Sequence, residues 1–212
     1  MLERDKERTR QKIIEALRHL LSQKGIQNLG VNTVAREAKV SKVLIYRYFG
    51  SMPELLRAFA QEGGLWPSTE ELMGANTNLR RITDIEQANI TLLCNFLKEI
   101  RRRKLTQEIM RWQLADSNEL TTYLLDIRER QRREIQSALP LNAAKYPEID
   151  LGAAMALLHA GLTHMVLSSK HSDEYMGIDL HSNFGWRRLE KAVEELIRGY
   201  FDRYRTKGEL AK

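Results

Sequence analysis

The chain has 212 residues, of which 42% are hydrophobic and 29% are charged, so it can bury a core and is not an intrinsically disordered tail. The formal net charge is +6, and all of it lies in residues 1–50, which carry 11 basic and 5 acidic side chains. The other 162 residues carry 23 basic and 23 acidic side chains, so their net charge is zero. A small basic module on a neutral body favours a nucleic-acid-binding function for the module.

The sequence predicts a cytoplasmic protein with no membrane partner. A single cysteine, Cys94, cannot form an intrachain disulfide, and the opening residues MLERDKERTR are charged where a secretory signal is apolar. The longest apolar stretch, residues 151–167, contains two histidines and is about one turn short of a membrane span.

Four prolines and the absence of long alternating β-branched runs predict an all-α fold. In chain order, the pattern predicts helices at residues 5–24, 32–38, 42–48, from 52 onward, 84–104, 106–115, 118–138, 150–169 and 184–205. Gly25 is expected to cap the first helix. Residues 66–81 form a connection with room for a short helix, and residues 171–183 form a loop long enough to be mobile.

Residues 31–56, VNTVAREAKVSKVLIYRYFGSMPELL, follow the pattern of a helix-turn-helix. Ala35 is small where the first helix must let the second cross closely. The turn falls at residues 38–40, and Ser41 is a good N-cap for the next helix. These features predict a DNA-binding head.

The second helix of the motif has two distinct sides. At 100° per residue, Ile45 and Phe49 point to one side, while Val43 and Arg47 point to nearly the opposite side. The first side is expected to pack inward, and the second is free to read a DNA groove. The candidate DNA-contacting residues are Asn32, Thr33, Ser41, Lys42, Val43, Leu44, Tyr46, Arg47 and Tyr48.

Other readings of these basic and aromatic residues remain open. Lys42 and Arg47 also fit a merely solvated face. Tyr46 and Tyr48 serve either as core aromatics or as hydroxyl donors to phosphates. The N-terminal basic run, Arg4 to Lys12, alternates with acidic residues, so a solvated helix start explains it as well as phosphate contacts do.

In these residues the chain resembles the TetR family of bacterial transcriptional regulators. The resemblance covers about residues 9–60; beyond them only the length, the all-helical body and the aromatic-rich last helix agree. It is carried by Ile14, Ala16, Leu21, Gly25, Val34, Ala35, Val40, Ser41, Lys42, Ile45, Tyr46, Phe49, Gly50, Ser51, Glu54, Leu55 and Leu56.

Several positions depart from the family pattern. Lys39 stands where glycine is usual, at a turn that favours positive φ, which costs about 1 kcal/mol for a residue with a side chain. Val43 and Leu44 replace small and hydroxyl residues, which suggests apolar contacts such as those with thymine methyl groups. Met52 stands where a lysine commonly meets a phosphate, and Gly30 where a threonine often caps the second helix.

Two long helices of the neutral body suggest a dimer interface. The helix at 150–169 is apolar nearly all round, and the last helix has a wider apolar face than one core contact needs. Together they resemble half of a four-helix interface, which is where the family dimerises, although two central core helices would show the same pattern. The candidate interface residues are Ala153, Leu157, Ala160, Trp186, Leu189, Val193, Leu196 and Tyr200.

The resemblance implies a ligand-responsive repressor that binds double-stranded DNA as a homodimer. Its operator is expected to be near-palindromic, with half-site centres about 34–36 Å apart, and an unidentified small-molecule effector is expected to release it. Residues 1–50 are assigned to DNA binding, and residues 51–212 to effector binding and dimerisation. The alternative is an architectural or division-linked DNA-binding dimer whose body binds a protein partner.

The residues expected to line an effector cavity are Cys94, Phe96, Met110, Trp112, Tyr123 and His159, although such residues also occur as plain core. The basic runs 101–104 and 128–133 fit an anionic effector, further phosphate contacts or, better, a solvated and partly paired face. Cys94 is expected to be a buried thiol rather than a redox sensor. No enzymatic motif, cofactor site or metal site is expected, since the histidine spacings of 5, 7 and 10 do not suit helical zinc ligands.

Overall fold

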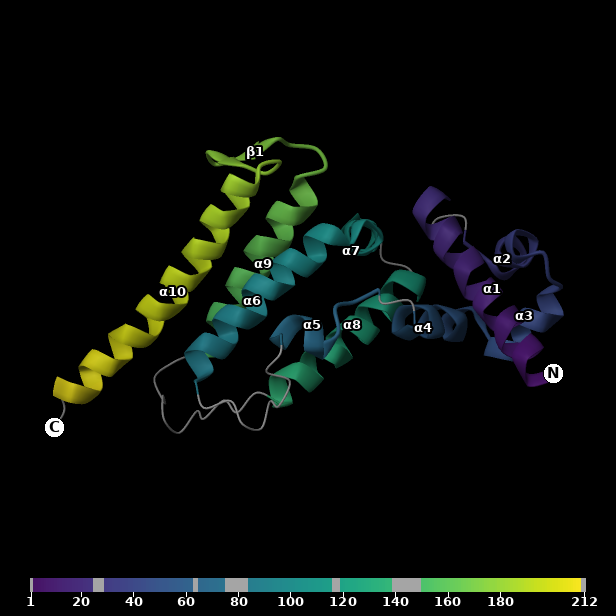
Figure 1. The fold of residues 1–212 in the computed structure, drawn as a ribbon, viewed down its shortest axis with the longest axis horizontal. Coiled ribbons are helices and arrows are strands. Elements are labelled where there is room, and N and C mark those ends of the chain that lie inside the picture. Colours follow the sequence, from purple (N-terminus) through teal and green to yellow (C-terminus); the bar gives the residue numbers. More distant parts are fainter. Residues whose placement is uncertain are drawn as a thin grey trace. The chain divides into compact units, whose positions relative to one another are not determined.

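The computed structural model describes residues 2–24, 29–62, 65–74, 84–115, 119–138 and 150–210. The predicted all-α fold is confirmed, with one small hairpin added (Figure 1). The helices are α1 (Leu2–Lys24), α2 (Val31–Ala38), α3 (Lys42–Phe49), α4 (Met52–Glu62), α5 (Thr69–Met73), α6 (Ile85–Arg102), α7 (Lys104–Ala115), α8 (Glu119–Ala138), α9 (Leu151–Ser168) and α10 (Asn183–Leu210). Gly25, the expected cap of α1, lies outside the described residues.

The chain divides into two compact units. Unit 1 comprises residues 1–66 and 103–132, which contain α1 to α4, α7 and most of α8. Unit 2 comprises residues 67–102 and 133–212, which contain α5, α6, the end of α8, α9 and α10. Each unit has its own buried side chains.

Unit 1 is built on the apolar stripe of α1. Ile13, Leu17, Leu20 and Leu21 are all buried, as their helical spacing predicts. They pack with buried side chains of the next three helices, since α1 contacts both α2 and α4, and α3 contacts α2 and α4. The buried partners in these helices include Val34, Ala35, Ala38, Ile45, Phe49, Leu55, Leu56 and Phe59.

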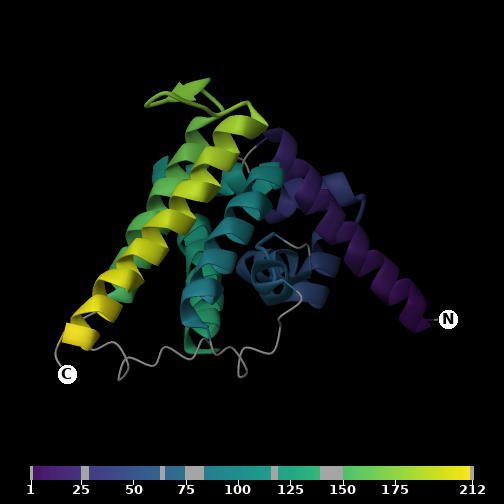
Figure 2. The same cartoon turned by 60° about the vertical axis from the view of Figure 1, so that its left-hand side comes forward.

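Unit 2 is organised around α6, which packs against α5, α9 and α10. The three long helices of unit 2, α6, α9 and α10, run alongside one another in both ribbon views (Figures 1 and 2). The short helix α5 lies in the connection where the sequence left room for one. Its N-terminus has a capping box, in which Ser68 and Glu71 each bond the other's backbone N–H.

The helix α9 is the one described helix that is long and apolar enough to cross a membrane, by length and composition alone. It has 18 residues, whereas the sequence predicts an apolar stretch about one turn too short to span a membrane. Only 17% of this stretch is buried within the protein, so most of its apolar surface faces outward. Core helices of proteins outside membranes meet the same criterion of length and composition.

The expectation of an irregular loop at residues 171–183 is wrong. Strands β1 (Glu174–Tyr175) and β2 (Ile178–Asp179) pair antiparallel in a hairpin beside the adjoining ends of α9 and α10 (Figure 2). Met176 and Gly177, the two turn residues, both have positive φ (49° and 77°), as the favoured two-residue hairpin turns require. The strands are too short for an alternating pattern to reveal them in the sequence.

The hairpin is tied to the first turn of α10. The indole N–H of Trp186 donates to the carbonyl oxygen of Leu180 at 2.8 Å, and both side chains are buried. A guanidinium N–H of Arg188 donates to the carbonyl oxygen of Gly177 at 2.9 Å. The Asp179 carboxylate accepts from the backbone N–H groups of His181 and Ser182, which lowers its pKa. This connection is therefore a folded element.

Candidate nucleic-acid interface

The turn between α2 and α3 has the conformation that the helix-turn-helix pattern predicts. Lys39 adopts φ 52° and ψ 47°, the left-handed region, at the C-cap of α2. The backbone N–H of Lys39 donates to Arg36, and that of Val40 to Ala35, at 3.2 and 3.0 Å. The turn is thus retained although a side chain stands where glycine is usual, and Lys39 carries the backbone strain.

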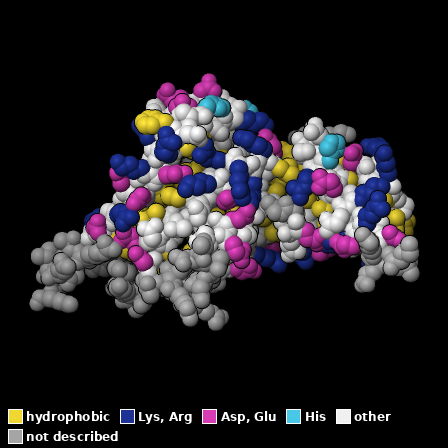
Figure 3. All heavy atoms as spheres, viewed as in Figure 1, with side chains coloured by type: hydrophobic (Ala, Val, Ile, Leu, Met, Phe, Trp, Pro, Cys, Tyr) yellow, Lys and Arg dark blue, Asp and Glu magenta, His cyan; other side chains and the backbone are white. Residues whose placement is uncertain are grey.

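The two sides of α3 separate as expected. Ile45 and Phe49 are buried against the rest of unit 1. On the other side, Val43 is 66% exposed and Tyr46 is 50% exposed, and the Arg47 side chain is exposed as well. Lysine and arginine side chains gather over the head in the space-filling view, at the right of Figure 3. An exposed helix face with apolar, phenolic and guanidinium groups has the chemistry that reads base edges and phosphates.

The other predicted DNA-contacting residues surround this face. In the structure Asn32, Ser41 and Lys42 are exposed, and Thr33, Leu44 and Tyr48 are half-buried. Ser41 stands at the N-cap position of α3, as predicted, but its side chain makes no cap hydrogen bond. The reason is local: the N–H of Leu44, which such a hydroxyl would accept from, donates to the backbone oxygen of Ser41 at 3.0 Å.

Arg10, from the N-terminal basic run, is engaged within the protein. Its guanidinium forms a two-pronged salt bridge with the Glu62 carboxylate at the end of α4, and this hydrogen bonding lowers the pKa of Glu62. The guanidinium also lies 5.3 Å from the ring centroid of Phe49 in α3. Arg10 therefore links α1, α3 and α4, whereas Lys6, Arg8 and Lys12 in the same run are exposed.

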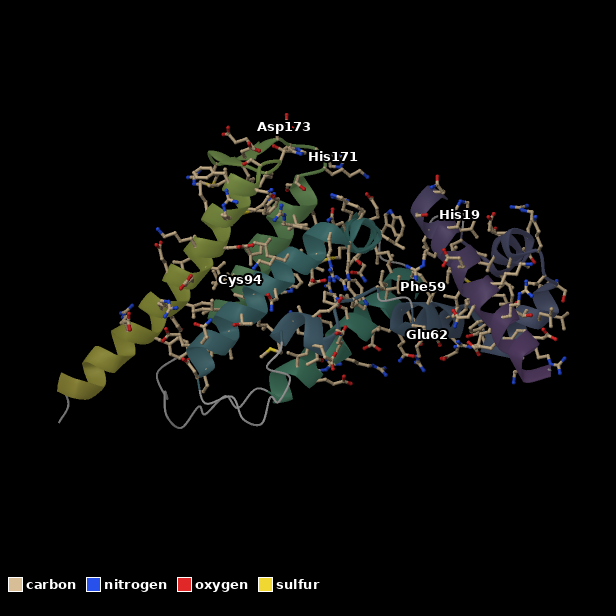
Figure 4. All side chains as sticks on the ribbon, viewed as in Figure 1. His19, Phe59, Glu62, Cys94, His171 and Asp173 are labelled. Atoms are coloured by element: carbon tan, nitrogen blue, oxygen red, sulfur yellow. The ribbon has the colours of Figure 1, made fainter. Side chains whose placement is uncertain are left out.

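Two further contacts of α1 hold the head together. Nδ1 of His19 lies 3.0 Å from the Glu37 carboxylate in α2, and the Arg18 guanidinium lies 5.4 Å from the ring centroid of Phe59 in α4. Figure 4 labels His19, Phe59 and Glu62 around α1. None of these pairs was visible in the sequence, since Arg10 and Glu62 are 52 residues apart and no local spacing relates them.

The predicted effector-lining residues fall in both units. In unit 1, Met110 is buried, Trp112 and Tyr123 are half-buried, and the Arg57 guanidinium lies 5.4 Å from the Tyr123 ring centroid. In unit 2, Phe96 and His159 stack with ring centroids 4.3 Å apart.

Cys94, in unit 2, is half-buried. Its thiol lies 3.9 Å from the carbonyl oxygen of Glu190, to which it donates, and burial, with the charge of Glu190 second, raises its pKa. A raised pKa disfavours the reactive thiolate, which agrees with the expectation of a structural thiol.

The predicted interface residues divide by exposure. Trp186, Leu189 and Val193 are buried within unit 2. Ala153 and Ala160 are exposed on α9, where Leu157 is 75% exposed, and Leu196 on α10 is 59% exposed. Tyr200 is half-buried, and its hydroxyl donates to the carbonyl oxygen of Asp150 at 3.3 Å. The outward apolar surface is thus made by α9 and the middle of α10.

Much of the two basic runs is paired. Arg101 lies 4.4 Å from the ring centroid of Trp186, and burial lowers its pKa. Arg102 pairs with Glu71 and Glu99 at 2.7 and 2.5 Å. The second run shows the same pattern, with Arg130 bound to Asp126 and Arg132 to Glu129, each at 2.7 Å. These contacts favour a solvated, paired face over a second DNA surface.

Among the described residues, no three His, Cys, Asp or Glu side chains gather as metal ligands do.

Comparison with known proteins supports this description. Residues 13–59, which span α1 to α4, match the family model of bacterial regulatory proteins, tetR family. No curated protein matches the chain.

Solved structures share its fold. The fatty acid degradation regulator FadR from Bacillus halodurans is 20% identical with a TM-score of 0.61, covering 88% of this chain and 96% of that one. A TetR family regulator from Marinobacter aquaeolei VT8 is 16% identical (TM-score 0.55; 91% and 98% covered), and a TetR-like regulator from Rhodococcus sp. RHA1 is 18% identical (TM-score 0.53; 90% and 96% covered). Residues 13–59 thus carry the match to bacterial regulatory proteins of the tetR family, and the whole chain shares the fold of solved TetR-family transcription regulators.

Proposed function

We propose that this regulator is a cytoplasmic repressor that binds a near-palindromic operator as a homodimer and is released by a small-molecule effector. The observation that carries the proposal is the two-sided α3, with Ile45 and Phe49 buried and Val43, Tyr46 and Arg47 exposed. In this proposal Arg47 and the Val43 methyl groups contact base edges, and the Tyr46 hydroxyl contacts a phosphate. Residues 1–50 form the DNA-binding head, and residues 51–212 form the effector-binding and dimerisation body.

The outward apolar surface of α9 supports the homodimer. An apolar helix with 17% of its length buried leaves Leu157 and its small neighbours in water unless another surface covers them. Helices with exposed alanines and glycines allow close approach of a second copy related by a two-fold axis. That symmetry would present two α3 helices to successive major grooves of one DNA face.

The test is operator binding by variants of α3. A palindrome selected from random DNA is titrated in gel-shift assays with the wild type, Arg47→Ala and Tyr46→Phe. We expect the Arg47→Ala affinity to fall about 10-fold or more, as the loss of one good base contact implies, and the Tyr46→Phe affinity to fall by less. The matched control is Arg187→Ala, which removes the same charge from an exposed position of α10. Unchanged affinity in both α3 variants, with folding intact by circular dichroism, would contradict the proposal.

A further inference from the structure

The segment from α2 to α3 carries a positive charge that the rest of the described chain does not neutralise. Residues 29–50 contain one acidic side chain, Glu37, and four basic ones, Arg36, Lys39, Lys42 and Arg47. All four basic side chains are exposed, and none of them forms an ion pair with another described residue. The Glu37 carboxylate has a partner outside the segment, since it lies 3.0 Å from Nδ1 of His19 in α1.

Elsewhere in the head several cations have carboxylate partners. The ion pairs are Arg10 with Glu62, Arg18 with Glu15 and Arg57 with Glu54. The basic runs of the helical body are largely paired as well. A cation without an internal partner keeps its charge available to an anion that binds from outside. The segment from α2 to α3 therefore has the electrostatics of an anion-binding surface.

Arg36 lies on an open side of α2. It follows Asn32 by four residues, so both side chains share one side of the helix, and both are exposed. Val34 and Ala38 project from the opposite side and are buried. Glu37 is held toward α1 by its contact with a histidine. The side that carries Asn32 and Arg36 is thus the one open to a partner.

Lys39 continues this open side into the turn. Its backbone N–H donates to the carbonyl oxygen of Arg36 at 3.2 Å, so the two residues are neighbours in space. Lys39 adopts φ 52° and ψ 47°, which costs a residue with a side chain about 1 kcal/mol and costs glycine nothing. Its side chain forms no ion pair among the described residues in return. A strained residue without an internal compensation indicates a functional role.

The helix-turn-helix geometry brings this side of α2 to the DNA backbone. In such motifs the second helix lies in the major groove and the first helix crosses the backbone. Here the second helix is α3, which begins at Lys42, three residues after Lys39. Arginine and lysine side chains beside the groove contact phosphates, which fix the register of the protein on the duplex and carry no sequence information.

We propose that Arg36 and Lys39 form a phosphate-binding edge, which holds the DNA backbone beside the groove that α3 reads. The Arg36 guanidinium can bind two phosphate oxygens at once, whereas the Lys39 ammonium acts as a point charge. Neither residue is among the DNA-contacting residues predicted from the sequence. The proposal rests on the proposed function in one respect, namely that α3 enters the major groove of DNA.

The test measures DNA binding by the full-length protein over a range of KCl concentrations, using fluorescence anisotropy. Arg36→Gln and Lys39→Gln remove the charge, and Lys39→Arg keeps it. Each phosphate contact contributes about 0.9 to the slope of log binding constant against log salt concentration, and the proposed homodimer carries each residue twice. We expect each glutamine variant to make this slope shallower by about 1.8, and Lys39→Arg to retain it.

Two duplexes of equal length, the selected palindrome and a scrambled sequence, separate phosphate contacts from base contacts. At a fixed salt concentration each glutamine variant should bind both duplexes several-fold more weakly, and by the same factor. Arg47→Ala, which removes a proposed base contact, should weaken binding to the palindrome more than to the scrambled duplex. The matched control is Arg187→Gln, which removes an exposed charge from α10 and should change neither affinity nor slope.

Lys39→Gly separates the phosphate contact from a structural role of the turn. Glycine relieves the backbone strain, so this variant should have a higher free energy of unfolding in urea than the wild type. It also lacks the ammonium group, so it should bind both duplexes as weakly as Lys39→Gln does. Stability and affinity should therefore change in opposite directions. A Lys39→Gly protein with the affinity and salt dependence of the wild type would overturn the role of Lys39.

The remaining outcomes are equally decisive. If the slope changes by less than about 0.9 in a glutamine variant, that residue does not contact a phosphate, and this result in both variants would overturn the proposal. A loss of affinity confined to the palindrome would assign a base contact and would also overturn it. If the wild type binds neither duplex, the proposed function itself fails. Unchanged slopes together with weaker binding by Arg47→Ala would reject the phosphate-binding edge alone.

Discussion

Lys39 holds a backbone conformation that its side chain disfavours, with φ at 52°. Replacing it with glycine should stabilise the protein by about 1 kcal/mol, because glycine adopts this region without the steric cost. Lys39→Ala is the control, since alanine keeps the cost and should change the stability little. Both are measured by urea unfolding, and equal midpoints for the glycine and alanine variants would contradict the prediction.

Gly185, in the first turn of α10, is fixed by the hairpin that precedes it. A Cβ at this position would lie 1.9 Å from the backbone oxygen of Asp179, and backbone atoms cannot move aside cheaply. We expect Gly185→Ala to destabilise the protein by about 2 kcal/mol, as overpacking typically does. Gly152→Ala, whose added Cβ would meet its nearest atom at an ordinary 3.5 Å, should not. Comparable melting temperatures for the two variants would contradict this.

At the scale of elements, the salt bridge between Arg10 and Glu62 joins α1 to α4. We expect Glu62→Gln to weaken operator binding by several-fold, although it removes a negative charge. Simple electrostatics predicts the opposite sign, because loss of a negative charge should strengthen attraction to DNA. Asp5→Asn, an equal charge change at an exposed site of α1, is the control. Tighter binding by Glu62→Gln would show that the bridge does not position the head.

The same bridge predicts a pH dependence. Arg10 lowers the pKa of Glu62, so the bridge contributes stability above the pKa that this carboxyl has in the unfolded chain, and the contribution is lost as the pH falls through the lower folded value. The difference in unfolding free energy between the wild type and Glu62→Gln should therefore be full at pH 7 and shrink toward pH 3. A difference that grows on acidification would contradict this sign.

Most helices could be predicted from the sequence, because their apolar residues repeat with the helical period and glycine or proline separates them. The orientation of α3 was predicted for the same reason, as Ile45 and Phe49 lie one turn apart. The hairpin was missed because two-residue strands show no alternation. The role of Arg10 was missed because its partner, Glu62, comes from a distant part of the chain. Side-chain pairing at long range depends on the fold and leaves no local pattern.

For the whole molecule, the apolar surface of α9 and α10 makes dimerisation testable apart from DNA. Leu157→Glu, and separately Leu196→Glu, would place a carboxylate on the surface that a second copy is proposed to cover. Burying that charge without a partner is costly, so each variant should sediment as a monomer. Met176→Glu introduces the same charge at an exposed hairpin position and should leave the dimer intact. Unchanged sedimentation of both α9 and α10 variants would place the interface elsewhere.

The hairpin between α9 and α10 also bears on how the protein folds. A connection held by short-range contacts brings the end of one long helix and the start of the next together before distant parts of the chain have met. The Trp186–Leu180 hydrogen bond spans only six residues, so it can form early. We therefore expect this corner to belong to the folding nucleus, and substitutions there to slow folding more than they speed unfolding.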